Sequence, residues 1–338
     1  MECWSTERPF PTLHYSTTPI LHMGELMRLR SKDILGLEEM SADEIELILQ
    51  TATSFKDILN RPIKKVPTLR GRSIVTLFYE ASTRTRTSFE TAAKIMSADT
   101  SSIAAATSSV VKGESLKDTV LTLQSMRPDV FIIRHPASGA PHFVAKLIPQ
   151  SVINAGDGMH EHPSQGLLDM MTILENKGRL RGLTVAIVGD ILHSRVARSN
   201  LWGLTKMGAK VRFVGPKTLI PPEAAKLPVE VFTNLEEGIK GVDVVNVLRI
   251  QLERMKKGLF PSIREYSRLY GITNERLKAA KDDVIVLHPG PMNRGIEILP
   301  EVADSSCSMV TTQVTNGVAV RMALLYLLMG GSEDAIAS

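Results

Sequence analysis

Cysteine is scarce in this sequence: only two occur among 338 residues, Cys3 and Cys307. Two thiols cannot supply the four thiolates of a cysteine-only zinc site, and they do not indicate a disulfide framework. Chains that do without disulfides are typical of reducing compartments, so we expect a cytoplasmic location.

Long apolar runs and long basic runs are also missing. No stretch approaches the roughly 20 consecutive apolar residues of a membrane-spanning helix, and residues 1–30 lack the apolar segment of a secretory signal. The formal net charge is only +4, without a Lys/Arg block or an aromatic series suited to nucleic acid. We therefore expect no membrane and no nucleic-acid partner. Residues 1–30 are expected to form a flexible N-terminal extension.

The phosphate-binding motifs of nucleotide enzymes are absent as well. The segment "AIVGDILHSRVARS" (186–199) lacks G-x-G-x-x-G, and no G-x-x-x-x-G-K-[ST] occurs in the chain. These absences disfavour two classes of enzyme, the NTPases and the NAD-dependent dehydrogenases. The dehydrogenase is kept as the alternative from a different functional class. Asp157, His160 and His162 could ligate a metal, but no second cluster of ligands supports such a site.

The sequence does contain a regular alternation of short apolar strands and helical segments. Its hydrophobic content of 43% and charged content of 22% describe a folded globular protein. The alternation predicts an α/β fold with parallel sheets, and the length favours two domains. The expected strands are 73–78, 129–133, 151–154, 184–189, 210–215, 242–248 and 283–287.

Two helices are marked by residues at their ends. Ser41 and Glu44 have the spacing of a capping box at the start of an amphipathic segment. Pro163 and Gly178 bracket a helix that divides the chain into halves of about equal length. The last segment predicts a helix over about 311–329.

Polar side chains follow most of the expected strands. In open α/β sheets, ligands bind beyond the carboxyl ends of the strands. These side chains are therefore expected to gather at one edge and to bind a strongly anionic ligand set. In chain order they are "STRTR" (82–86), Arg134, His135, His160, His162, Gln165, His193, Arg195, Arg249, Gln251, His288 and Gly290.

The segment "YEASTRTRTSFE" (79–90) allows two interpretations. One is a hydroxyl-rich helix cap with two solvated arginines. The other is an oxyanion-binding cradle, because a helix N-terminus already presents free N–H groups and a positive dipole end. The added arginines favour phosphate. Arg84 is then the better candidate for ligand contact, and Arg86 for a structural or interface role.

Seven motifs resemble those of the aspartate/ornithine carbamoyltransferase family, in order from about residue 31 to the C-terminus. They are "STRTR" (82–86), "VKGES" (111–115), "RHP" (134–136), "HPSQ" (162–165), "HSR" (193–195), "LRIQLER" (248–254) and "HPGP" (288–291).

The resemblance implies an α/β fold with two similar-sized domains, each a parallel sheet flanked by helices, linked by bridging helices. Residues 31–164 would bind carbamoyl phosphate and residues 165–310 aspartate. A C-terminal helix over about 311–330 would pack back on the first domain.

The resemblance also implies roles for individual residues. Ser82, Thr83, Arg84 and Thr85 would hold the phosphate of carbamoyl phosphate. Its carbonyl oxygen would be bound by Thr85, Arg134 and His162, its amino group by Gln165, and further contacts would come from the backbone of Gly290 and Pro291. The aspartate carboxylates would be held by Lys112, Arg195, Arg249 and Gln251. Among these, the catalytic residues would be Arg84, Thr85, Lys112, Arg134 and His162.

Family members are homotrimers with shared active sites, which implies that Ser108 and Lys112 come from a neighbouring subunit. The sequence leaves open whether the trimer joins a larger assembly with regulatory chains or with a dihydroorotase.

The implied reaction transfers the carbamoyl group of carbamoyl phosphate to the amino group of L-aspartate, an early step of pyrimidine biosynthesis. It requires no metal and no organic cofactor. Ornithine or a related acceptor is the alternative. The three cations Lys112, Arg195 and Arg249 favour a dicarboxylate, and "HPGP" differs from the "HCLP"-like segment typical of the ornithine branch.

Overall fold

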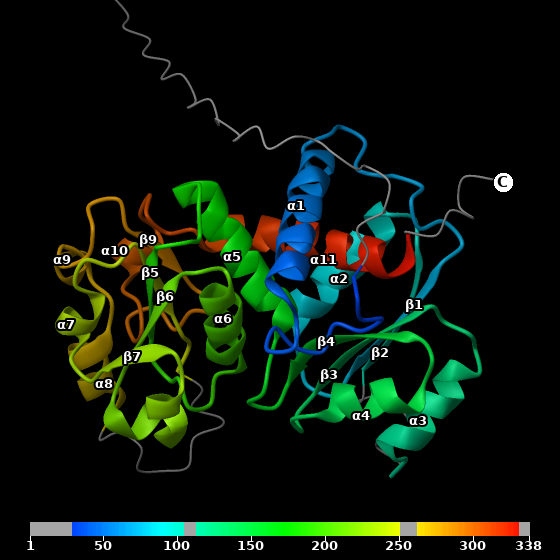
Figure 1. Cartoon of the computed structure of the whole chain (residues 1–338), viewed down its shortest axis with the longest axis horizontal. Coiled ribbons are helices and arrows are strands. Elements are labelled where there is room, and N and C mark those ends of the chain that lie inside the picture. The colour runs from blue at the N-terminus through cyan, green and yellow to red at the C-terminus, as the bar shows by residue number, and fades with distance from the viewer. Residues whose placement is uncertain (1–28, 105–112, 251–261, 331–338) are drawn as a thin grey trace, which may run out of the picture.

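Two parallel sheets form the framework of the molecule (Figure 1). The computed structural model describes residues 29–104, 113–250 and 262–330. The first sheet has the order β2-β1-β3-β4. Its strands are β1 (Ser73–Phe78), β2 (Asp99–Ala104), β3 (Val130–His135) and β4 (Ser151–Asp157).

The second sheet has the order β7-β6-β5-β8-β9. Every pairing in both sheets is parallel, so the carboxyl ends of the strands in each sheet share one edge. The strands are β5 (Thr184–Val188), β6 (Lys210–Val214), β7 (Val229–Phe232), β8 (Val244–Val247) and β9 (Ile285–Leu287).

The predicted fold class is confirmed, because helices flank both sheets (Figure 1). Each of the seven expected strands is present, with boundaries shifted by a few residues. The sequence analysis missed β2 and β7, which are edge strands. β2 reads "DTSSIA" and β7 is largely exposed, so neither carries the continuous apolar run of a buried parallel strand.

Helices cover both faces of the first sheet (Figure 1). On β1, Ile74 packs into the core shared with α1, α2 and α11, whereas Val75 and Leu77 pack toward α3 and α4. This division follows from the alternation of side chains along a strand. The helices are α1 (Ala42–Leu59), α2 (Thr83–Ile95), α3 (Leu116–Gln124), α4 (Ala140–Leu147), α5 (Pro163–Lys177) and α11 (Val310–Met329).

The second sheet is covered by shorter helices. α6 (Arg195–Lys206) packs on one face, where Leu201 and Leu204 join Val185 and Ile187 in the main core. The other elements are α7 (Leu235–Ile239), α8 (Ile263–Tyr270), α9 (Asn274–Leu277), α10 (Pro300–Ala303) and two short 3₁₀ helices, Lys217–Leu219 and Pro222–Lys226.

The predicted helix ends are also confirmed. Ser41 caps α1, and the Ser41 and Glu44 side chains bond each other's backbone N–H groups at 3.3 Å and 3.0 Å. Pro163 begins α5, and Gly178 ends it in the left-handed conformation, with φ +70°. Glycine adopts this conformation without the Cβ strain of other residues.

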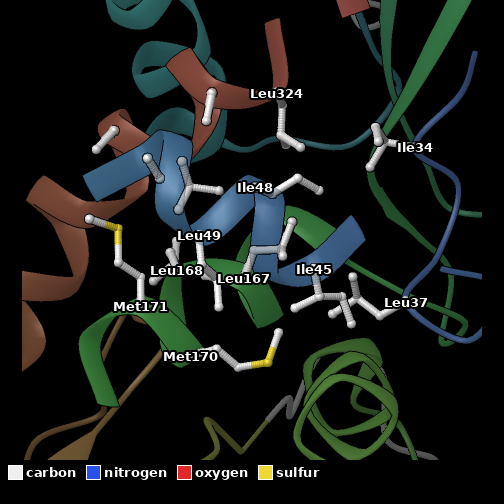
Figure 2. Close-up of a cluster of buried hydrophobic side chains, with 14 of the residues drawn as sticks. Ile34, Leu37, Ile45, Ile48, Leu49, Leu167, Leu168, Met170, Met171 and Leu324 are labelled. Carbon is white, nitrogen blue, oxygen red and sulfur yellow. The ribbon is translucent and has the colours of Figure 1, made fainter. Parts of the chain in front are cut away.

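α5 is the central packing element. Its residues from Pro163 to Ile173 are all buried, and it packs against α1, α6 and α11. Figure 2 shows Leu167 and Leu168 of α5 beside Ile48 and Leu49 of α1. α11 in turn packs against α1 and α2, so one apolar core joins the two sheets' helices.

In the part of the chain that the structure describes, no helix has the length and apolar character needed to cross a bilayer. The predicted N-terminal extension lies outside the described residues, apart from residues 29 and 30.

Candidate active site

The first turn of α2 forms one wall of the site. Ser82 is the N-cap of α2, yet within the described residues its hydroxyl makes no capping hydrogen bond. The first turn also carries no acidic residue. The N–H groups and the positive dipole end of the helix therefore remain available to an anion. This arrangement favours the oxyanion cradle over the hydroxyl-rich cap.

Thr85 links this wall to the start of α5. Its Oγ1 lies 3.5 Å from Nε2 of His162, the N-cap residue of α5, and both side chains are buried. The backbone N–H of His162 donates to Ser199 Oγ at 2.8 Å, and Ser164 Oγ lies 3.5 Å from His162 Nδ1. These contacts fix the imidazole with Nε2 toward α2.

His162 is neutral at physiological pH. Burial lowers the pKa of His162 well below its usual value, and the positive charges of three arginines lower it further. They are Arg134, Arg195 and Arg321. A neutral imidazole can donate one hydrogen bond from Nε2 while Nδ1 accepts from Ser164, which suits a donor to a developing oxyanion.

The lowered pKa of His162 predicts a loss of stability in acid. Unfolded His162 takes up a proton below about pH 6.5, whereas the native residue stays neutral, so stability falls as the pH drops from 6.5 toward the native pKa. In denaturant titrations, we expect the unfolding free energy of the wild type to fall, relative to that of His162→Gln, by up to ~1.4 kcal/mol per pH unit below 6.5. Parallel pH dependences of the two proteins would contradict this assignment.

Two arginines, one at the end of β3 and one at the start of α6, contact the same carboxylate. Arg134, at the end of β3, lies with its Nε 3.3 Å from Glu80 Oε2 and donates from Nη1 to the Ala155 carbonyl at 3.2 Å. Arg195, the first residue of α6, donates from Nη2 to the same Glu80 oxygen at 2.7 Å. Glu80 therefore connects the end of β1 to the second sheet's α6. The sequence analysis did not single out Glu80.

Gly156 provides the space in which these arginines approach each other. Its φ is +113°, and a Cβ built there would lie 3.1 Å from Arg195 Cζ and 3.3 Å from Arg134 Nη1. A side chain at this position would meet both guanidinium groups. The sequence analysis also missed this residue, which lies in β4 just beyond the expected strand 151–154.

Arg84 lies beside the 288–291 segment and near Arg249. A Cβ on Gly290 would lie 3.0 Å from Arg84 Cζ and Nη1, so the guanidinium lies directly against this glycine. Partial loss of hydration lowers the pKa of Arg84, and the charge of Arg249 lowers it further. Arg84 and Arg249 therefore lie within electrostatic reach of each other. The neighbouring Pro291 is exposed, as is Thr83 at the start of α2.

Gln165 lies one turn into α5 from His162. Its Nε2 donates to Asp169 Oδ1 at 2.9 Å, and both side chains are buried. Burial raises the pKa of the Asp169 carboxyl to about 6, although four side-chain hydrogen bonds oppose the shift. Asp169 was not among the predicted residues.

Three other histidines near the strand ends are engaged within their own segments. His135 Nδ1 accepts from the Ala137 N–H at 3.0 Å, and His193 Nδ1 lies 2.9 Å from Asp190 Oδ1. His288 is buried, and its Nδ1 accepts from the Gly290 N–H at 2.8 Å. These contacts give the three histidines structural roles.

Two groups of side chains have the composition of a metal site: His142, Asp157 and His160, and Glu38, His160 and Glu161. The combination of Asp157, His160 and His162, which the sequence analysis considered and left unsupported, is not one of them. Asp157 already accepts the Gly139 N–H at 2.6 Å, Asn154 Nδ2 at 2.9 Å and the Glu161 N–H at 3.1 Å. Its carboxylate already accepts three hydrogen bonds from neighbouring groups, so we assign no metal to it.

The structure places six of the predicted residues beside one another. Arg84 and Gly290, Thr85 and His162, and Arg134 and Arg195 form three neighbouring pairs. The predicted residues Ser108, Lys112 and Gln251 lie outside the described residues.

Comparison with known proteins identifies this arrangement. The family model "Aspartate/ornithine carbamoyltransferase, carbamoyl-P binding domain" matches residues 32–175. The model "Aspartate/ornithine carbamoyltransferase, Asp/Orn binding domain" matches residues 181–328. The chain belongs to the aspartate/ornithine carbamoyltransferase family. This membership confirms the family resemblance.

Relatives that share high sequence identity with this chain are aspartate carbamoyltransferase catalytic subunits. The aspartate carbamoyltransferase catalytic subunit of Moorella thermoacetica is 69% identical over 307 residues, covering 91% of this chain and 100% of the relative. That of Heliobacterium modesticaldum is 67% identical over 306 residues, covering 90% and 98%.

Solved structures show the same fold in both branches of the family. Ornithine carbamoyltransferase from Pyrococcus furiosus has a TM-score of 0.80 at 30% identity, covering 91% of this chain and all of its own. Aspartate transcarbamoylase from Trypanosoma cruzi, in complex with N-(phosphonacetyl)-L-aspartic acid, has a TM-score of 0.81 at 29% identity, covering 88% and 96%. The fold therefore does not separate the two acceptors. The sequence relatives do, and they confirm the prediction of an aspartate-type enzyme over the ornithine alternative.

Proposed function

We propose that this chain transfers the carbamoyl group of carbamoyl phosphate to the amino group of L-aspartate. The products are N-carbamoyl-L-aspartate and phosphate, in an early step of pyrimidine biosynthesis. The 69% identity to an aspartate carbamoyltransferase catalytic subunit over that subunit's full length carries this proposal. The concentration of arginines beside the open end of α2 supports it.

In this proposal, carbamoyl phosphate binds between the first turn of α2 and the 288–291 segment. Ser82, Thr83, Arg84 and Thr85 hold its phosphate through hydroxyls, backbone N–H groups and a guanidinium. Arg134, His162 and Thr85 donate to its carbonyl oxygen, and Gln165 accepts from its amino group. Gly290 and Pro291 contribute backbone contacts.

Aspartate binds on the side of the second sheet. Arg195 and Arg249 would hold its two carboxylates, helped by Lys112 and Gln251. Guanidinium groups match carboxylates with paired, parallel hydrogen bonds. The ammonium group of ornithine would meet like charges in the same place, which selects against it.

The chemistry follows from this placement. The neutral aspartate amine attacks the carbamoyl carbon, and negative charge grows on the carbonyl oxygen. The C–O bond to phosphate then breaks, and the phosphate leaves with the proton that the amine loses. Fixed donors at that oxygen stabilise the transition state, each contributing about 3 kcal/mol if losses typical of oxyanion holes apply. Phosphate is a good leaving group, so orientation and electrostatics suffice without a metal or an organic cofactor.

The proposal extends to domains and location. Residues 31–164, with the helix near 311–330, would form the carbamoyl-phosphate domain, and residues 165–310 the aspartate domain. The scarcity of cysteine supports a cytoplasmic location. Assembly with regulatory chains or a dihydroorotase would be additional to the homotrimer.

Acceptor choice is tested by phosphate release from carbamoyl phosphate with equal concentrations of L-aspartate or L-ornithine. We expect turnover with aspartate and only background with ornithine. The same assay under a range of aspartate concentrations gives the KM. Turnover with ornithine alone would overturn the proposed acceptor.

A homotrimer with shared sites predicts complementation between two inactive variants. Lys112→Ala and Arg84→Ala would each damage a different subunit's contribution to the same site. In trimers reassembled from an equal mixture, roughly a quarter of the sites would contain both intact residues. We therefore expect up to about a quarter of wild-type activity after mixing, dissociation and reassembly.

The control mixture is Arg84→Ala with Arg134→Ala, since both residues belong to the same subunit's half of the site. No hybrid can then restore a complete site, so activity should stay at the level of the parents. Equal behaviour of the two mixtures would contradict sharing through Lys112.

A further inference from the structure

A fully buried carboxylate on α5 collects amide groups from four elements. Asp169 Oδ1 accepts from Nε2 of Gln165 at 2.9 Å and from Nε2 of Gln313 on α11 at 2.7 Å. Its Oδ2 accepts from Nδ2 of Asn200 on α6 at 2.7 Å and lies 3.4 Å from Nδ2 of Asn246 on β8. We call these five residues the Asp169 cluster.

The chemistry of a carboxylate decides how the amides around it are oriented. An ionised carboxylate only accepts hydrogen bonds, so each amide facing it must present its NH₂ group and turn its oxygen away. For Gln313 the consequence is visible, because its Oε1 accepts the His288 backbone N–H at 2.9 Å. The cluster thereby anchors the start of the 288–291 segment.

The same rule applies to Gln165 on the site side. Its Nε2 is held by Asp169, so its Oε1 is left as an acceptor. No other hydrogen bond from the Gln165 side chain is present within the described residues, and only Asp169 fixes its orientation. A freely turning amide would present NH₂ to a donor ligand as readily as oxygen.

We propose that Asp169 is a positioning residue, which holds Gln165 with its oxygen toward the ligand so that the site recognises the NH₂ group of a carbamoyl ligand. The inference rests on the proposed function, because it takes the carbamoyl amino group as the partner of Gln165. It adds a reason for a charge in the core. Burial raises the pKa of Asp169 to about 6, so the buried surroundings disfavour the ionised form of this side chain.

The test compares two ligands that differ in the amide. Phosphonoacetamide carries a phosphonate and a carbamoyl-like NH₂ group, whereas inorganic phosphate has no amide. In Asp169→Leu, calorimetric titration should show phosphonoacetamide binding weakened by about tenfold, the equivalent of one well-placed hydrogen bond. Phosphate binding should stay within about twofold. Equal weakening of both ligands would indicate general loosening and overturn the proposal.

The conservative variant Asp169→Asn should restore the ligand preference. Its oxygen can still face Gln165 and Gln313 while its NH₂ turns to Asn200, whose Oδ1 is buried without a partner among the described residues. If Asp169→Asn loses phosphonoacetamide as severely as Asp169→Leu, acceptor orientation is not the role of this residue. Thr172→Val, a buried polar change on the same helix, is the control for stability and should alter neither affinity.

A second pair of variants keeps the test informative if Asp169→Leu does not fold. Gln165→Glu sets two acceptors face to face and should weaken phosphonoacetamide binding, and adding Asp169→Asn should recover part of it. An unchanged affinity in the double variant would also overturn the proposal. Failure of the wild type to bind either phosphonoacetamide or carbamoyl phosphate would instead contradict the proposed function.

Discussion

Arg84→Ala is expected to lower kcat/KM by about 10²–10³, the loss seen when a fixed donor to a developing charge is removed. The guanidinium of Arg84 lies against Gly290 and within electrostatic reach of Arg249. It stands at the first turn of α2, where the N–H groups of the helix are open. Removing it would leave the phosphate-binding end of the site with dipole and hydroxyls alone. Steady-state kinetics with both substrates measure the effect.

Arg86→Ala is the matched control, two residues along the same helix. Arg86 Nε lies 3.7 Å from Glu90 Oε1 in an i,i+4 pair on a partly exposed surface. Such pairs contribute only about 0.3–0.5 kcal/mol to stability, so we expect kcat/KM within about twofold of the wild type. Equal losses in the two variants would contradict the distinct role given to Arg84.

Gly156→Ala is expected to lower kcat/KM by about 10², because small misplacements of positioned groups have effects of that size. The new methyl would lie about 3.1 Å from Arg195 Cζ and close to Arg134 Nη1, so both guanidinium groups must shift. The backbone, at φ +113°, would be strained as well. We expect KM to rise for aspartate and kcat to fall, since Arg195 and Arg134 serve different substrates in the proposed site.

Gly178→Ala separates backbone strain from displacement of the arginines. Gly178 also has a positive φ, +70°, but a Cβ there meets nothing within 4 Å. This variant should lose about 1 kcal/mol of stability with normal kinetics. A comparable kinetic loss in both glycine variants would show that strain, and not the approach of the arginines, explains the effect of Gly156→Ala.

Much of the fold could be predicted because its signals are local. The buried strands carry continuous apolar runs, and the Ser41–Glu44 capping box and the Pro163 and Gly178 helix ends each occupy a short window. β2 was missed because its residues "DTSSIA" lie on a sheet edge, where a strand needs no apolar run. Pairing with β1 makes it a strand, and pairing partners cannot be read from the segment itself.

The candidate site divides in the same way. Residues that follow strands, such as Arg134 and Arg195, could be selected because parallel strands end at a common edge. Glu80 could not be selected from the sequence, because its role depends on the ion pair with Arg195, which lies 115 positions along the chain. Asp169 likewise acquires its role from Gln313, 144 positions away. The functional roles of the site residues, those of Lys112, Ser108 and Gln251 included, stay predictions.

Product formation from [¹³C]carbamoyl phosphate and L-aspartate, followed by ¹³C NMR, tests the central claim most directly. We predict that the label moves into the ureido carbon of N-carbamoyl-L-aspartate, one equivalent for each phosphate released. Label that stays in carbamoyl phosphate or its breakdown products, or that enters citrulline when ornithine is supplied instead, would contradict the account.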